Sequence, residues 1–319
     1  MRRSLCGLLA LALVAGWALA RDEDDEEKLK RLVRQLKADS VDVRRQSAGS
    51  LARMGADAKP AVKALSQAML KDKDAKVRRY CVFAIKAIGD GAKSAVPDVI
   101  KVLQNDTDDD VRIIACNTLK AFAAEPKTAV PALAKALSVK NVGPYAADAL
   151  ADFGKDAKPA IAELVKALEG KATRSYAARA LGKIGKDALP SLTKAVGHKD
   201  EDVRVEAVLA LEHIGKDSVP TLVTALKDKD KDVRLNAVGT LGKLGKDAKE
   251  AVKGLATIVE KDESTDIRVT AASVLGKLGP DAKDAVPALE RAIKAATKDK
   301  NDRAQRAAES ALEEIKPKK

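Results

Sequence analysis

The side chains best suited to catalysis or metal binding are few in this sequence of 319 residues. It holds only two histidines, His198 and His213, and neither forms a Cys–His pair with a neighbouring cysteine. A zinc or di-iron site needs several His, Cys or carboxylate ligands, which two isolated histidines do not supply. The sequence also lacks a Gly-rich phosphate loop after a strand and a Gly-x-Ser-x-Gly turn. We therefore expect a non-enzymatic protein with no catalytic residue, no metal and no cofactor.

The three cysteines do not indicate a network of disulfides. Cys6 lies in an apolar N-terminal segment, whereas Cys81 and Cys116 fall at positions where a repeated pattern carries small apolar residues. Cysteine often acts as a small core residue, and helices roughly 9 Å apart rarely bring two Cα atoms within disulfide range. The sequence leaves open whether Cys81 and Cys116 pair.

Seven arginines, called here the arginine ladder, each follow directly after a β-branched residue. An anion-binding ladder is one interpretation, but a structural role explains these residues better. Acidic residues such as Asp42, Asp110 and Asp202 precede most of them, so each guanidinium could reach a carboxylate or a turn carbonyl of its own or a neighbouring copy. The ladder consists of Arg44, Arg78, Arg112, Arg174, Arg204, Arg234 and Arg268.

Aromatic residues gather in one register of the same pattern. Three positions after the β-branched residue, successive copies carry Tyr80, Ile114, Tyr145 and Tyr176, and Phe83 lies one turn after Tyr80. Tyrosine is enriched where partners dock, because it offers a large rigid area with a polar tip. The same rings could instead seal the margin of the core with their hydroxyls in water. We name these five residues as candidate partner-binding residues.

These positions belong to a unit that recurs nine times, every 30 to 37 residues. Within a copy, Val203, Ala207, Ala210, Leu211 and Ile214 show the apolar spacing of an amphipathic helix. A glycine follows the helix in seven copies and suits a left-handed C-terminal cap. Repeats of this length are typical of solenoids. The copies begin at Val43, Val77, Val111, Val142, Thr173, Val203, Val233, Ile267 and Ala304.

A second pattern between the copies indicates a second helix. A residue that can cap a helix is followed three positions later by proline, which is tolerated in a first helical turn. Each unit is therefore predicted to be a helical hairpin that buries its apolar stripe only against its neighbours. Together they predict an all-α fold, a right-handed α-solenoid of about nine stacked helical hairpins. The capping residues are Asp57, Ser94, Thr128, Asp156, Asp187, Asp217 and Asp284.

The unit Asp-x-x-Val-Arg-x-x-Ala-x-x-Ala-Leu-x-x-Ile-Gly, clearest at Asp202 to Gly215 and Asp232 to Gly245, resembles a HEAT repeat. More narrowly, it resembles the short HEAT-like repeats found in phycobilisome bilin lyases. This resemblance implies the fold over residues 27–315 but says little about function, because such repeats serve scaffolds, adaptors and a few enzymes. Hydroxylases of the deoxyhypusine type carry several His-Glu dipeptides, and this sequence has none.

The ends of the chain differ from the repeats. Arg2-Arg3, the apolar run from Leu5 to Ala15 and the small residues around Ala20 predict a secretory signal peptide over residues 1–20. An acidic leader at 21–26 and a basic tail at 316–319 flank the repeat region. The apolar run is shorter than the ~20 residues that span a bilayer. We expect an exported protein, periplasmic or extracellular, without a membrane span after cleavage.

The chain carries 59 basic against 47 acidic residues, which raises the question of a nucleic-acid partner. Lysines such as Lys155, Lys186 and Lys216 recur in register after the capping glycines, but aspartates alternate with lysines in the loops and keep both signs mixed. We therefore expect a monomer that binds no nucleic acid.

Two functions remain. The first is a non-enzymatic extracytoplasmic scaffold whose curved solenoid surface binds a protein or peptide of unknown identity. The alternative is a lyase-like protein that handles a bilin or another small ligand in the groove of the solenoid. The first is favoured, because no acid–base pair in the sequence supports the second.

Overall fold

The computed structural model describes residues 25–122 and 125–316 of the chain. This part is helical and contains no strand. The chain divides into two compact units, Met1–Ala136 and Leu137–Lys319. Within the described residues, unit 1 holds three helix pairs and unit 2 holds five, followed by one further helix. The predicted all-α solenoid of helical hairpins is confirmed.

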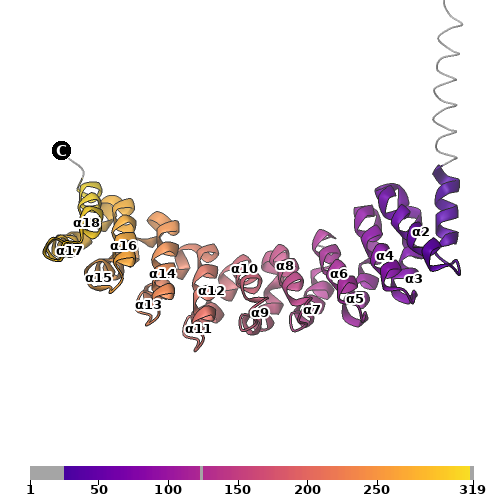
Figure 1. The fold of residues 1–319 in the computed structure, drawn as a ribbon, viewed down its shortest axis with the longest axis horizontal. Helices are drawn as coiled ribbons and strands as arrows, with labels where there is room; N and C mark the ends of the chain where they lie inside the picture. The colour runs from indigo at the N-terminus through magenta and orange to yellow at the C-terminus, as the bar shows by residue number, and fades with distance from the viewer. Residues whose placement is uncertain (1–24, 123–124, 317–319) are drawn as a thin grey trace, which may run out of the picture. The chain divides into compact units, whose positions relative to one another are not determined.

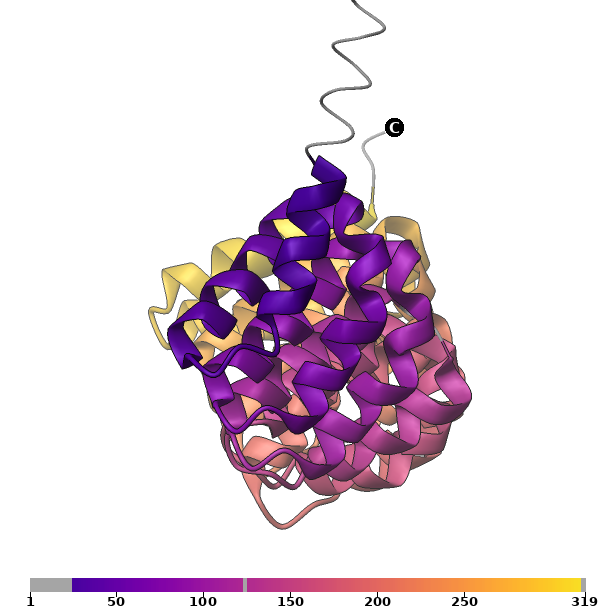
Figure 2. The same cartoon turned by 90° about the vertical axis from the view of Figure 1, so that its right-hand side faces the viewer.

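Unit 1 is built from two rows of helices. In Figure 1, α2, α4 and α6 lie in one row, and α3, α5 and α7 lie in the other. Figure 2 looks along the stack and shows the indigo and violet helices of this unit from the side, one behind the next. A helix over residues 25–35 precedes α2. The elements are α2 (Val41–Met54), η1 (Gly55–Ala61), α3 (Val62–Lys71), α4 (Ala75–Ile88), η2 (Gly89–Ala95), α5 (Val96–Asn105), α6 (Asp109–Phe122) and α7 (Pro126–Ala136).

Unit 2 repeats the same two-row arrangement. Its even-numbered helices form one row and its odd-numbered helices form the other (Figure 1). The first row comprises α8 (Gly143–Phe153), α10 (Arg174–Ile184), α12 (Glu201–Leu211), α14 (Lys231–Leu244), α16 (Thr265–Leu278) and α18 (Asp302–Ile315). The second row comprises α9 (Ile161–Ala167), α11 (Leu189–Ala195), α13 (Val219–Ala225), α15 (Val252–Lys261) and α17 (Val286–Lys298). Short 3-10 helices join them: η3 (Gly154–Ala160), η4 (Gly185–Ala188), η5 (Glu212–Ser218), η6 (Gly245–Ala251) and η7 (Gly279–Ala285).

The apolar spacing of each copy forms the core, as the sequence predicts. Val203, Ala207, Ala210, Leu211 and Ile214 are all buried. The leucine or isoleucine eight positions after the β-branched residue is fully buried in eight copies. Alanine nearby lets neighbouring helices approach closely, so each hairpin depends on its neighbours for burial.

Where a glycine joins the two helices of a hairpin, the joint differs from the predicted left-handed helical cap. Gly245, for example, has φ 57° and ψ −130°, a region that side chains with a Cβ rarely adopt. Gly245 adopts these angles because the 3-10 helix η6 starts at this residue, so the chain turns sharply and continues directly into the second helix of the hairpin. All seven glycines at these joints have positive φ.

The prediction that Asp57 caps the second helix is wrong. The helix α3 starts after Ala61 without a side-chain cap, because η1 leads straight into it and the Val62 N–H donates to the Lys59 carbonyl. Asp57 lies in the first turn of η1 instead. The equivalent starts of α5, α9, α11, α13 and α17 also lack a side-chain cap.

The predicted terminal segments lie largely outside the described residues. The signal peptide at 1–20 and residues 317–319 of the tail fall there, and so do residues 21–24 of the acidic leader. Residues 25 and 26, predicted as leader, already belong to the first helix. Over the part of the chain that is described, no helix is both long and apolar enough to cross a membrane.

Two glycines of one hairpin provide a matched test of the joint. Gly239 lies inside α14 and Gly245 ends it, and an added Cβ meets no atom within 4 Å at either position. We expect Gly239→Ala to raise the free energy of unfolding by about 0.5–1 kcal/mol through helix propensity. Gly245→Ala should lower it by about 1–3 kcal/mol through backbone strain. Urea unfolding followed by circular dichroism measures both, and effects of the same sign would contradict the proposed role of the joint.

Candidate functional site

The arginine ladder connects neighbouring copies through forked ion pairs. In unit 1, Arg78 on α4 donates from Nε and Nη2 to the two carboxylate oxygens of Asp106, at 2.7 and 2.8 Å. Its Nη1 donates to the backbone carbonyl of Asp72, at 3.0 Å. Asp106 belongs to the turn that opens the next copy, so one guanidinium ties its own turn to that of its neighbour. Both side chains are largely withdrawn from solvent, which strengthens such a pair.

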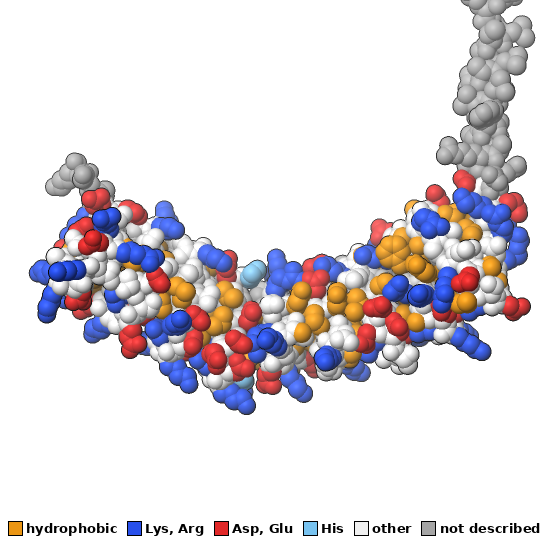
Figure 3. Space-filling view, in the orientation of Figure 1, with side chains coloured by type: hydrophobic (Ala, Val, Ile, Leu, Met, Phe, Trp, Pro, Cys, Tyr) orange, Lys and Arg blue, Asp and Glu red, His pale blue; other side chains and the backbone are white. Residues whose placement is uncertain are grey.

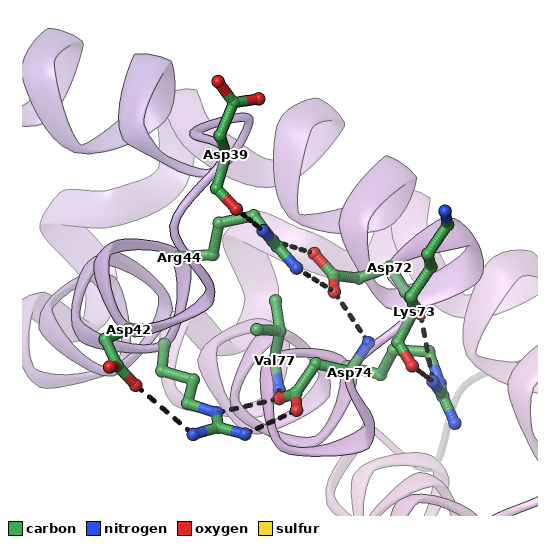
Figure 4. A network of polar contacts seen from close by, with 9 residues as sticks. Asp39, Asp42, Arg44, Asp72, Lys73, Asp74 and Val77 are labelled. Atoms are coloured by element: carbon green, nitrogen blue, oxygen red, sulfur yellow. Dashed lines mark hydrogen bonds and ion pairs between the residues drawn. The ribbon is translucent and has the colours of Figure 1, made fainter.

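Figure 4 shows the preceding rung of the ladder. Arg44 donates to both carboxylate oxygens of Asp72, at 2.7 and 3.1 Å, and to the carbonyl of Asp39 at 2.9 Å. Asp72 in turn accepts the backbone N–H of Asp74, at 2.9 Å. Asp72 is therefore held by its side chain from one copy and by its backbone carbonyl from the next.

Asp74 forms a second link and caps α4. Its carboxylate accepts the backbone N–H of Val77 at 3.0 Å and the forked guanidinium of Arg45 at 2.6 and 3.0 Å. Hydrogen bonding by Arg45 lowers the pKa of Asp74 to about 2. Aspartates of the preceding turns cap α4, α6, α12 and α14 in this way, whereas α2, α8, α10 and α16 start without a side-chain cap.

Unit 2 contains three further rungs. Arg204 binds the carboxylate of Asp228 at 2.8 and 3.0 Å, and Arg234 binds that of Asp262 at 2.7 and 3.2 Å. Arg174 reaches Asp202 at 2.5 Å and Asp200 at 3.4 Å. The carboxylate that binds each of these arginines belongs to the following copy. The sequence pattern had instead indicated the acidic residues that precede each arginine as its partners. Asp42 and Asp202 illustrate the difference, since they bind Arg45 and Arg174.

Two members of the ladder bind carbonyls without a carboxylate. Arg112 donates to the Leu103 carbonyl at 2.9 Å, and Arg268 donates to the Asp262 carbonyl at 2.7 Å and to the Thr265 hydroxyl. Neither forms an ion pair within residues 25–122 and 125–316. In every copy that carries it, the ladder arginine is thus engaged by groups of the turns, so its donors are directed at the protein itself.

The aromatic candidates of unit 1 form an exposed surface, here called the aromatic patch: Tyr80, Phe83 and Ile114. Tyr80 and Phe83 lie on α4 with exposed fractions of 36% and 47%, and Ile114 on α6 is half-buried. The guanidinium carbon of Arg79 lies 5.9 Å from the centre of the Tyr80 ring. Figure 3 shows apolar side chains gathered over α4 among charged surroundings. The patch therefore combines exposed rings with a flanking cation.

The remaining candidates belong to unit 2. Tyr145 on α8 and Tyr176 on α10, called here the tyrosine pair, have exposed fractions of 43% and 42%. Their helices pack directly against each other. One turn further along, Asp148 and Arg179 form an ion pair between the same two helices. The structure thus places Tyr145 and Tyr176 on neighbouring helices of unit 2, whereas the aromatic patch lies in unit 1. The five candidates therefore form two surfaces, one in each unit.

The cysteines and histidines take structural positions. Cys81 and Cys116 are buried free thiols, and burial raises both pKa values, that of Cys116 to about 12. His198 accepts the backbone N–H of Asp200 through Nδ1 at 3.1 Å, as Asp72 does for Asp74. His213 is exposed. Among the described residues, no group of three or more His, Cys, Asp or Glu is placed to hold a metal.

A groove between α3 and α5 of unit 1 is absent from the sequence predictions. It consists of two adjoining hollows of about 630 and 400 Å³, and Leu70 lines both. The recurrence of lysines along the sequence does not predict this groove. Its hollow form depends on the small side chains at Ser66, Gly91 and Ser94.

Comparison with protein families identifies the repeated unit. The family model described as HEAT repeats matches residues 62–151, 140–212, 189–261 and 219–313. The search of curated proteins finds no match. The narrower resemblance to the bilin-lyase type stays a prediction from the sequence.

Solved structures with similar folds include that of the karyopherin Kap121p. Kap121p has a TM-score of 0.68 at 14% identity, and the match covers 91% of this chain and 37% of that chain. Kap121p bound to the SUMO protease Ulp1p has a TM-score of 0.67 at 14% identity, and the match covers 91% of this chain and 37% of that chain. Kap95p in the structure with RanGDP has a TM-score of 0.54 at 14% identity, and the match covers 91% of this chain and 45% of that chain. At this identity the likeness shows the fold alone, and the chain spans less than half the length of these proteins.

Replacing a ladder arginine by lysine tests whether the fork matters beyond its charge. Lysine keeps the charge but cannot donate along two parallel bonds. We expect Arg204→Lys to lower the free energy of unfolding by about 2 kcal/mol, because it breaks forked bonds to the largely buried Asp228. Arg303→Lys, in an exposed pair with Asp266, should cost less than about 0.5 kcal/mol. Equal losses in urea unfolding would show that the buried fork has no special role.

Proposed function

The chain belongs to the HEAT-repeat family, and on this premise we propose that it is a non-enzymatic extracytoplasmic scaffold that binds another protein or an extended peptide. The observation that carries the proposal is the exposure of large aromatic side chains on helices that are otherwise tightly packed. Tyr80, Phe83, Tyr145 and Tyr176 are four of the six large apolar side chains exposed in the described part of the chain. Rings presented in this way lose little conformational entropy on binding.

The packing of α4 holds the exposed rings of Tyr80 and Phe83 in fixed positions. Val77, Cys81 and Ile85 bury the opposite side of α4, and the fork from Arg78 to Asp106 fixes α4 to the next copy. A partner that covered Tyr80 and Phe83 would therefore meet a preformed surface. Buried aromatic anchors of this kind typically contribute about 2 kcal/mol or more each to binding.

The solved structures with this fold support a protein partner. Kap121p has been crystallised bound to Ulp1p, Nup53p and Pho4p. A stack of helical hairpins is thus able to bind proteins and leaves the choice of partner to its surface residues. For this chain we assign that choice to the aromatic patch and to the tyrosine pair.

The proposed compartment follows from the N-terminal sequence. Two arginines, an apolar run and small residues before Ala20 are the three parts of a secretory signal. Export would place the scaffold in the cell envelope or outside the cell, where its partner would also have to be found.

Proximity labelling of the full chain in its native envelope tests this proposal. One variant carries Tyr80→Ser and Phe83→Ser, and a second carries Tyr145→Ser and Tyr176→Ser. The control is Leu235→Ser, which removes an exposed apolar side chain outside both surfaces. We expect at least one aromatic variant to lose a discrete set of labelled proteins by tenfold or more, because each anchor contributes about 2 kcal/mol.

All variants should retain the wild-type circular dichroism spectrum and melting temperature, since these side chains are exposed. Equal labelling by wild type, both aromatic variants and the control would remove the two surfaces from the account. Labelling in the cytoplasm alone would contradict the proposed compartment.

A further inference from the structure

The groove between α3 and α5 has an apolar floor. Met69 and Val102 line it and are almost completely buried, and Ser66 beside them is 8% exposed. Leu70 stands at the junction of the two hollows with 37% of its surface exposed. An exposed leucine above a closed floor is a ready contact for an apolar side chain of a partner.

The walls of the groove carry unpaired positive charge. Lys59, Lys63 and Lys71 line the larger hollow, and all three are exposed. None of them forms an ion pair with any residue of 25–122 or 125–316. Three ammonium groups along one short groove raise the local positive potential, which attracts anionic ligands.

The acidic residues of the groove are already neutralised. Asp98 binds Lys101 at 2.8 Å, so the single carboxylate of the larger hollow has a cation of its own. Asp72 and Asp106 line the smaller hollow and accept the forks of Arg44 and Arg78. The lysines are thus the only charges of this groove without a partner in the described part of the chain.

We propose that this groove binds an acidic peptide segment of a partner protein, with an apolar side chain of the peptide seated on Leu70 and its carboxylates bound by Lys59, Lys63 and Lys71. The ten residues of α3 extend about 15 Å, which matches about five residues of an extended chain. Hollows of this volume lie within the usual range of ligand sites.

The lining favours a peptide over a nucleic acid. Single-stranded nucleic acids bind where bases stack on aromatic side chains, and the residues that line the two hollows include no aromatic ring. The apolar floor and Leu70 instead suit an aliphatic side chain between carboxylates. The proposal adds a third surface to the scaffold and rests on the proposed function only in taking a peptide as the occupant.

The test uses the full mature chain and a fluorescein-labelled peptide, Glu-Glu-Asp-Leu-Asp-Glu, in fluorescence anisotropy at 50 and 150 mM salt. The uncharged peptide Gln-Gln-Asn-Leu-Asn-Gln is the ligand control. We expect the acidic peptide to bind more tightly at the lower salt concentration, and the triple variant Lys59→Glu, Lys63→Glu, Lys71→Glu to weaken binding at least tenfold. Leu70→Ser should weaken it about threefold without a change of charge.

The matched control is Lys229→Glu, Lys246→Glu, Lys253→Glu, which makes the same change of charge at exposed lysines of unit 2. It should change the affinity less than twofold at 150 mM salt, because these lysines do not line the groove and salt screens charges that are not in contact with the peptide. Equal losses in the two triple variants, no binding by wild type, or equal binding of the uncharged peptide would overturn the proposal. Displacement of the peptide by a lower concentration of single-stranded DNA would reassign the groove to nucleic acid and also overturn it. The aromatic surfaces are unchanged in every variant, so these outcomes leave the labelling test independent.

Discussion

The forked ion pair between an arginine of one copy and an aspartate of the next is the interaction on which the arrangement of the copies depends. Removing charged groups from water is costly, so these residues stabilise the stack only while every donor and acceptor is bound. Asp72 meets this condition: its carboxylate accepts from Arg44 and from the Asp74 N–H, and its carbonyl accepts from Arg78. Register between copies is therefore set by polar groups, whereas burial is provided by the leucines and alanines beneath them.

The functional surfaces follow from this division of roles. Because polar turns and apolar stripes hold the hairpins, the outward positions are free to vary, and copies two to five place apolar or aromatic side chains there. The ladder arginines bind Asp72 and Asp106 near the groove of unit 1, and Lys101 binds Asp98. Lys59, Lys63 and Lys71 are left as the unpaired charges of the groove in the described part of the chain. A structural constraint thus determines the electrostatic character of a candidate binding surface.

The sequence predicted the hairpins and their core well, because Val203, Leu211 and similar residues recur at helical spacing and the packing is local. It did not predict which aspartate binds each arginine, since the fork crosses to the next copy and only the stacked geometry decides this. Asp57 was misjudged as a cap because the 3-10 helix after the glycine already satisfies the start of α3. The role of His198 was detectable, since it occupies the position of Asp72 and Asp228 when the copies are aligned. The groove was not, because it depends on which side chains remain unpaired in three dimensions.

A double-mutant cycle on Arg78 and Asp106 tests the central claim most directly. The free energy of unfolding would be measured for wild type, Arg78→Met, Asp106→Asn and the double variant. If the fork couples the two copies, the effects should be non-additive by about 1.5 kcal/mol or more, because either single change leaves a largely buried group without its partner. Additive effects within about 0.5 kcal/mol would show that the ladder does not hold the copies in register, and would contradict this account.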